Sequence, residues 1–289
     1  MQFFLQTLVA GIGIGSIYVL VALGFSLVYR TMGLVNFAHG DILMIGAFIS
    51  STFFVTNSLP FPIAMILAII MTAIIGFVIE RILRPLENKD FDLMLIGTIG
   101  FGIVLQAIAI LIWGATGRSV PFPVAGTPFN VFGIYIKQYE LLTILVASVA
   151  TVLLWIFLNR SKRGIAMQAV AMNFEAATVQ GVNVGRSNAI AFAIGAGLAA
   201  LAGGLAAPIL YVSSTFGANL GIMGFAAAIL GGFGNIKGAI VGGLVFGVIR
   251  SFASGLFQGY ADLAVFLIFA IIVVVKPTGI FGESTVNRA

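Results

Sequence analysis

Glu140-Leu-Leu-Thr-Ile-Leu-Val-Ala-Ser-Val-Ala-Thr-Val-Leu-Leu-Trp-Ile-Phe-Leu158 is an almost uninterrupted apolar run that leads directly into the polar Asn159-Arg-Ser-Lys-Arg-Gly164. A run of this kind can cross a membrane as one helix, because about 20 apolar residues span the hydrocarbon core. Lys and Arg accumulate in cytoplasmic loops, so the basic residues after the run indicate its cytoplasmic end. The stretch therefore predicts a membrane-spanning helix that ends in the cytoplasm.

The rest of the chain repeats this pattern. Of its 289 residues, 61% are hydrophobic and only 8% are charged, whereas a soluble domain carries about 25% charged residues. We therefore expect an all-α polytopic membrane protein, a bundle of about eight to ten transmembrane helices that forms a single domain over residues 1–289. The short, glycine-rich run at 219–234 predicts a broken or re-entrant segment. The expected spans are the apolar runs 4–29, 40–58, 61–80, 93–113, 140–158, 188–210, 219–234, 238–257 and 260–275.

The basic residues predict the orientation of the chain. Only three of them, Arg118, Lys137 and Arg250, fall on the side that we assign to the outside. We therefore expect an N-terminus outside the cell membrane and a cytoplasmic C-terminus. The first residues lack a basic segment and a cleavage site, so we expect them to begin the first span instead of a removable signal peptide. The basic residues assigned to the cytoplasm are Arg30, Arg81, Arg84, Lys89, Arg160, Lys162, Arg163, Arg186, Lys237, Lys276 and Arg288.

The polar segment 159–188 is the longest one flanked by basic residues. Its apolar side chains recur at helical spacing, and Gly181 lies where a glycine ends a helix. The segment therefore predicts a short amphipathic helix at the cytoplasmic face, whose apolar side needs either lipid or another subunit as its partner. The residues at helical spacing are Ile165, Ala169, Met172, Ala176 and Val179.

Several kinds of chemistry are missing from the sequence. The chain has no cysteine and one histidine, and none of its lysines follows a glycine as a phosphate loop requires. No nucleophile and base can be paired, so we expect a protein that is not an enzyme and holds no cofactor or metal. The net charge of +5 is spread over loops, which does not favour nucleic-acid binding. The acids Asp41, Glu80, Glu140 and Asp262 lie near the ends of runs, which disfavours an ion-driven carrier.

Residues 33–48 place Asn36, His39 and Asp41 just before an apolar run, with Gly40 among them. One interpretation is an ordinary helix start at the inner membrane interface, with Asn36 as its cap and Asp41 complementing its positive end. The other is a broken element at the inner mouth of a pathway, with these four residues as a candidate gate. A lone histidine among apolar neighbours is more often structural than titrating.

Four motifs together resemble one family, the H-type permease subunit of bacterial high-affinity branched-chain amino-acid ABC importers (the Liv family). The resemblance covers nearly the whole chain. The motifs are Gly33-Leu-Val-Asn-Phe-Ala-His-Gly40, Glu175-Ala-Ala-Thr-Val-Gln-Gly181, Gly231-Gly-Phe-Gly-Asn235 and Lys276-Pro-Thr-Gly-Ile-Phe-Gly282.

The resemblance implies a multi-pass permease of the bacterial inner membrane that imports leucine, isoleucine and valine. It implies a second, M-type permease, two cytoplasmic ATPase subunits that bind ATP and magnesium, and a periplasmic substrate-binding protein. In such importers a loop similar to Glu-Ala-Ala-x-x-x-Gly docks on the ATPase, which implies this role for Glu175, Ala176, Ala177 and Gly181. The usual continuation, Ile-x-Leu-Pro, is not kept after Ile190. Permeases for urea or short amides in the same family are an alternative, as is a carrier or channel that needs no ATPase.

The composition of the segment 159–188 favours docking over lipid. Its apolar face is mostly Ala and Met and is poor in the Trp, Phe and Leu that anchor helices in lipid. Its polar face is not basic, unlike that of membrane-surface helices. Ala176 and Ala177 carry little side-chain bulk, so we expect a groove on the ATPase to close around this part of the helix.

Overall fold

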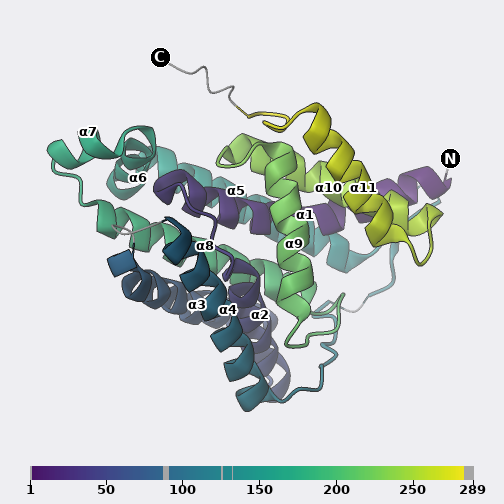
Figure 1. Cartoon of the computed structure of the whole chain (residues 1–289). Helices are drawn as coiled ribbons and strands as arrows, with labels where there is room; N and C mark the ends of the chain where they lie inside the picture. The colour runs from purple at the N-terminus through teal and green to yellow at the C-terminus, as the bar shows by residue number, and fades with distance from the viewer. Residues whose placement is uncertain (1, 87–90, 125, 132, 283–289) are drawn as a thin grey trace. The chain divides into compact units, whose positions relative to one another are not determined.

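The structure is a computed structural model that describes residues 2–86, 91–124, 126–131 and 133–282 (Figure 1). Lys89 and Arg288, two of the cations assigned to the cytoplasm, lie outside the described residues. The α-helices of the described residues are α1 (Gln2–Met32), α2 (His39–Ser51), α3 (Phe61–Leu83), α4 (Phe91–Trp113), α5 (Gln138–Arg160), α6 (Lys162–Met172), α7 (Phe174–Val179), α8 (Val184–Ala206), α9 (Phe216–Gly231), α10 (Ile236–Leu256) and α11 (Ala261–Val275).

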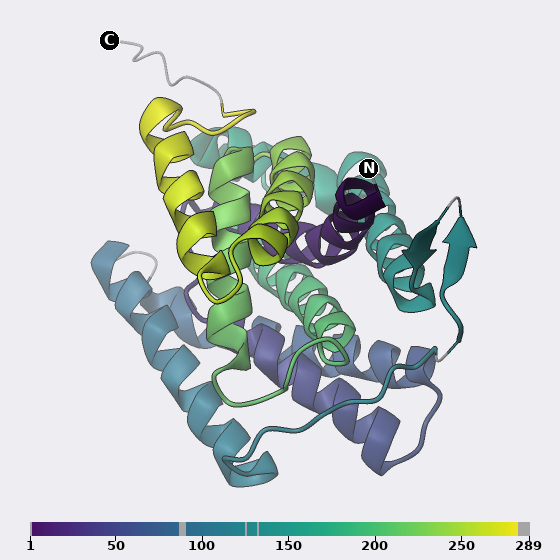
Figure 2. The same cartoon turned by 90° about the vertical axis from the view of Figure 1, so that its right-hand side faces the viewer.

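Short irregular turns extend two of these helices. A π-helical turn, Thr52–Thr56, continues α2, and a 3₁₀ turn, Arg84–Leu86, continues α3. The strands β1 (Phe129–Val131) and β2 (Ile134–Ile136) form an antiparallel hairpin, drawn as two arrows in Figure 2. This hairpin is not predictable from the sequence, because three-residue strands are too short to show an alternating pattern.

The predicted all-α polytopic membrane protein is confirmed, because each of the nine apolar runs forms a helix. In the part of the chain that the structure describes, seven helices are long and apolar enough to cross a membrane. The runs 219–234 and 260–275 form the shorter apolar helices α9 and α11. The helix α9 is continuous over its 16 residues, so the run at 219–234 is short but not broken. The seven long helices are α1, α2 with its π-helical turn, α3, α4, α5, α8 and α10.

The described residues divide into two compact units, and three helices, α1, α5 and α9, contribute residues to both. Residues 1–26, 124–148 and 223–289 belong to unit 1, and residues 27–123 and 149–222 belong to unit 2. The expectation of a single domain over 1–289 stays a prediction.

The helix α8 forms the centre of unit 2, and 83% of its most apolar stretch is buried. It packs against both α2 and α3. A methyl group on Gly46 of α2 would collide with the backbone of Ala200, and one on Gly203 would collide with the carbonyl of Leu43. Glycine at these positions therefore lets the backbones of α2 and α8 touch, which is the close approach that small residues allow in membranes.

Unit 1 uses the same device between α1 and α10. A methyl group on Gly247 would collide with the backbone of Gly15, and one on Gly243 would lie 2.6 Å from the backbone nitrogen of Val19. Helix α10 also packs against α11, where Arg250 and Asp262 form an ion pair with an N–O distance of 3.2 Å. Small residues therefore allow close helix packing in both units.

The C-terminal motif 276–282 folds back onto the turn between α9 and α10. The backbone N–H groups of Ile280 and Phe281 donate to the carbonyls of Leu230 and Gly231 at 2.8 and 2.9 Å. The side chain of Asn235, the N-cap of α10, donates to the carbonyl of Phe281 at 3.1 Å. Unit 1 therefore brings two of the four family-like motifs into direct contact.

Candidate functional site

The polar segment 159–188 forms two helices, α6 and α7, where one was predicted. Asn173 has extended backbone, with φ −158° and ψ 107°, which ends α6. The same residue begins α7, because its side-chain oxygen accepts a hydrogen bond from the backbone N–H of Ala176 at 2.9 Å. An asparagine at this position is a typical N-cap. The prediction of one continuous helix is therefore wrong at Asn173.

The end of α7 agrees with the prediction for Gly181. Its φ of +82° lies in the left-handed region that favours glycine. Gly181 N–H donates to the carbonyl of Thr178 at 2.9 Å, and Val182 N–H donates to the carbonyl of Ala177 at 3.0 Å. These two bonds form a Schellman motif, which satisfies the last carbonyls of the helix. Gly181 thus fixes the point where the chain leaves α7.

The side chains of α7 point in different directions. Ala177 is only 4% exposed and packs inside unit 2, whereas Glu175 and Ala176 are exposed. The expectation that both alanines face a partner is therefore wrong for Ala177. The exposed surface is also bulkier than predicted, since large apolar side chains of α6 and α7 lie open. They are Ile165, Met172, Phe174 and Val179, with Met172 79% and Val179 88% exposed.

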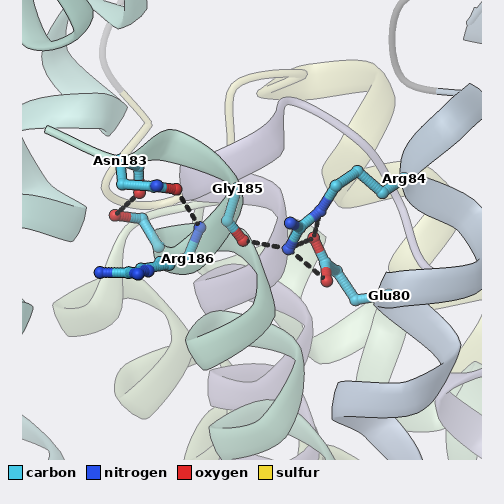
Figure 3. A network of polar contacts seen from close by, with 6 residues as sticks. Glu80, Arg84, Asn183, Gly185 and Arg186 are labelled. Carbon is cyan, nitrogen blue, oxygen red and sulfur yellow. Dashed lines mark hydrogen bonds and ion pairs between the residues drawn. The ribbon is translucent and has the colours of Figure 1, made fainter.

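A partly buried ion pair lies where α3 meets the first turn of α8 (Figure 3). The guanidinium of Arg84 donates to both carboxylate oxygens of Glu80 at 2.8 to 2.9 Å. It also donates to the carbonyl of Gly185. Glu80 lies near the end of an apolar run, where a charge is expected to cost little, but its side chain is 0% exposed. The spacing of Glu80 and Arg84 is a visible signal for the pair, whereas nothing local in the sequence indicates Gly185.

The candidate gate residues Asn36, His39, Gly40 and Asp41 lie together at the start of α2, and all four are buried. Asn36 is not the helix cap, because Ala38 holds that position without a side-chain bond. Its side-chain oxygen instead accepts from the N–H of Ala38 at 3.1 Å, which closes the turn ahead of the helix. Asp41 lies in the first turn of α2, as predicted.

Contacts with α4 and α9 hold this start of α2. Gln106 of α4 donates to the carboxylate of Asp41 at 2.8 Å. A methyl group on Gly40 would lie 2.6 Å from the carbonyl oxygen of Gly217 in α9. The backbone of α2 therefore approaches α9 closely, and the acidic group of Asp41 has a hydrogen-bond donor on a neighbouring helix. His39 is 1% exposed between these contacts.

The start of α2 is also bonded to α4 at two levels. The backbone N–H of Phe37 donates to the hydroxyl of Thr98 at 3.3 Å, and the carboxylate of Asp41 accepts from Gln106 at 2.8 Å. Since α4 begins at Phe91 and rises 1.5 Å per residue, these partners lie about 10 Å and about 22 Å along it. The ordinary helix start at the inner interface and the broken element at the mouth of a pathway both stay predictions.

The similarity to known proteins extends over nearly the whole chain. A family model described as the branched-chain amino acid transport system permease component matches residues 7–276. The chain belongs to this family. It is a multi-pass membrane protein and a member of a family of transport permeases, which agrees with the resemblance of its four motifs.

Relatives and a solved structure place this permease among similar proteins. BraD of Pseudomonas aeruginosa, a high-affinity branched-chain amino acid transport system permease protein, is 35% identical over 99% of this chain and 98% of BraD. LivH of Salmonella typhimurium, with the same description, is 34% identical with the same coverage. The structure of PsaBC from Streptococcus pneumoniae in complex with Fab matches 95% of this chain and 91% of its own with a TM-score of 0.51. Its identity is 16%, so this is a likeness of fold.

Proposed function

We propose that this chain is the inner-membrane permease subunit of an ATP-driven importer for leucine, isoleucine and valine. It forms the translocation pathway with a second, M-type permease, and two separate cytoplasmic ATPase subunits supply the energy. A periplasmic binding protein delivers the amino acid. The observation that carries the proposal is the match to BraD and LivH over nearly the full length of all three chains.

The exposed surface of α6 and α7 is the proposed contact with the ATPase. It carries the large apolar side chains Ile165, Met172, Phe174 and Val179 among exposed polar ones, and it lies in a segment flanked by basic residues, on the side that the positive-inside rule assigns to the cytoplasm. Glu175 and Ala176 provide exposed contacts. Ala177 attaches α7 to unit 2, and Gly181 ends the helix. In this proposal Glu175 and Ala176 contact the ATPase, whereas Ala177 and Gly181 hold α7 in place.

Asn36, His39, Gly40 and Asp41 are the proposed gate of the pathway. Their support is the burial of all four residues beside the turn of non-helical backbone that precedes α2. Within a membrane such a turn is tolerated where protein or a water-filled cavity covers it. Gly40 and Gly217 lie in close contact here, and in the proposed mechanism a shift between α2 and the start of α9 opens or closes this point. Alternating access then follows when substrate and nucleotide each favour one arrangement.

Copurification and uptake together test the proposal. The tagged chain, extracted in mild detergent, is expected to bring with it a second permease and the ATPase chains. Reconstituted in liposomes with its binding protein, the complex is expected to take up labelled leucine only with ATP inside, and unlabelled isoleucine and valine are expected to compete. Uptake driven by an ion gradient without ATP would overturn the proposal. Competition by urea or acetamide but not by valine would show that the substrate is a urea-like or amide compound instead of a branched-chain amino acid.

The proposed orientation has its own test, because the chain contains no cysteine. Two single substitutions are suitable, Tyr135→Cys at an exposed position of β2 and Asn159→Cys at the exposed end of α5. Any labelling of this chain by a thiol reagent then comes from the introduced cysteine. In intact cells with a permeable outer membrane, a membrane-impermeant maleimide is expected to label Tyr135→Cys only. Asn159→Cys is expected to react after the inner membrane is opened. The reverse pattern would invert the proposed topology.

A further inference from the structure

The first turn of α8 is held from two sides. On one side, Arg84 of the α3 extension donates to the carbonyl of Gly185. On the other, Asn183 caps the helix, because its side-chain oxygen accepts from Arg186 N–H at 2.9 Å (Figure 3). The two contacts meet within three residues of one another, where the chain enters the membrane-spanning part of α8. The start of α8 is therefore bonded both to the extension of α3 and to the connection that leads from α7.

Glu80 makes the contact of Arg84 possible. A cation beside the N-terminal end of a helix is unfavourable, because that end carries partial positive charge. The fully buried carboxylate of Glu80 neutralises the guanidinium and fixes its plane through hydrogen bonds to Nε and Nη2. Nη2 is then directed at Gly185. An arginine is needed here, since its planar fork bonds a carboxylate and a third acceptor at once.

The connection between α7 and α8 is short. Helix α7 ends at Val179, and only Gln180, Gly181 and Val182 separate it from Asn183. Val182 N–H also donates to the carbonyl of Ala177, so the connection is both short and hydrogen-bonded to α7. We therefore expect a displacement of α7 to move the first turn of α8.

We propose that Glu80 and Arg84 are positioning residues that make α3 and α8 move as one body when α7 is displaced. The inference rests on the proposed docking of α7 to an ATPase. Helix α8 passes the movement on, because it packs against α2 through Gly46 and Gly203, and α2 begins at the proposed gate. We call Glu80, Arg84 and the carbonyl of Gly185 the clamp. When the clamp is lost, the ATPase subunits still hydrolyse ATP, but fewer amino-acid molecules are transported per ATP hydrolysed.

Substitutions on both sides of the clamp test the inference. A methyl group introduced by Gly185→Ala lies 2.9 Å from the Cζ atom of Arg84, so the guanidinium must move away. Gly197→Ala in the same helix is the matched control, because its methyl group meets nothing closer than 3.4 Å. Arg84→Lys keeps the charge but lacks the fork. Glu80→Gln leaves Arg84 beside the positive end of α8 without its counter-charge.

The readout is the number of leucine molecules transported per ATP hydrolysed by the reconstituted complex, with the amount of assembled complex measured in parallel. We expect Gly185→Ala and Glu80→Gln to lower this ratio at least fivefold, Arg84→Lys to lower it less, and Gly197→Ala to leave it unchanged. If the Glu80→Gln complex fails to assemble, Gly185→Ala and Arg84→Lys test the inference without it. An unchanged ratio of transport to ATP hydrolysis in both variants would overturn the proposed role of the clamp. A wild-type complex without ATP-dependent uptake would instead overturn the proposed function, and the clamp with it.

Discussion

Ala176→Arg is expected to lower ATP-driven uptake about a hundredfold while the permease still folds. Ala176 is exposed on α7, so the new side chain is free in the isolated chain. Docking on the ATPase would enclose its guanidinium without a partner, which costs several kcal/mol. Each 1.4 kcal/mol is a factor of ten in affinity, so the loss is about a hundredfold or more. The measurement is leucine uptake together with the amount of ATPase that copurifies.

The position of the substitution decides what this experiment means. Ala177→Arg is a poor probe, because Ala177 is 4% exposed and its replacement would damage unit 2 itself. Gly181 is equally unsuitable, since its positive φ strains any other residue. Asn159→Arg adds the same charge at the exposed end of α5 and is the control. Normal copurification and uptake by Ala176→Arg would remove α7 from the proposed interface.

Asp41→Leu is expected to lower uptake tenfold or more, whereas Asp41→Asn is expected to stay within about twofold of wild type. The carboxylate of Asp41 accepts a hydrogen bond from Gln106 of α4 in the interior of unit 2. Leucine leaves the side-chain amide of Gln106 without this partner, at a cost of about 1–3 kcal/mol. A cost of this size changes the equilibrium constant of the transport-competent arrangement about tenfold or more. Asparagine keeps an acceptor oxygen at the same place, so the contact between α2 and α4 survives.

The pair of Asp41 variants also separates two mechanisms. An ion-driven carrier that used Asp41 would lose transport in Asp41→Asn as completely as in Asp41→Leu, because both remove the charge. The measurement is uptake by both variants at constant internal ATP, with and without an ionophore that collapses the proton and sodium gradients. Loss of uptake in Asp41→Asn, together with sensitivity of the wild type to the ionophore, would contradict ATP-driven import.

The helices were predictable from the sequence because membrane spans are defined by length and hydropathy. Each expected run begins and ends within a few residues of the ends of the helix that it forms, the π-helical turn after α2 included. The division at Asn173 was not predicted, because Ile165, Met172 and Val179 keep one helical spacing across it. Periodicity alone does not distinguish one helix from two helices in a similar direction. The asparagine was the available signal, as a typical N-cap.

The candidate site was predicted less completely, because its geometry depends on distant contacts. Asp41 and Asn36 are visible in the sequence as polar residues beside an apolar run. Their surroundings, however, include Thr98 and Gln106, which lie more than 60 residues away. Gly185 is likewise 101 residues from Arg84. No local pattern carries such pairings, so the sequence predicts neither the contacts of the proposed gate nor the clamp.

The central place of α8 has a consequence for the biogenesis of the chain. Of the seven long helices in the described residues, His39–Thr56 has the lowest mean hydropathy, 1.3, and it depends on α8 for close packing. About 130 residues separate the end of α2 from the start of α8, and synthesis at about 5–20 residues per second delays α8 by on the order of ten seconds. During that time α2 lacks its main partner. The packing of α2 is therefore complete only after α8 has been made, so unit 2 assembles late in the synthesis of the chain.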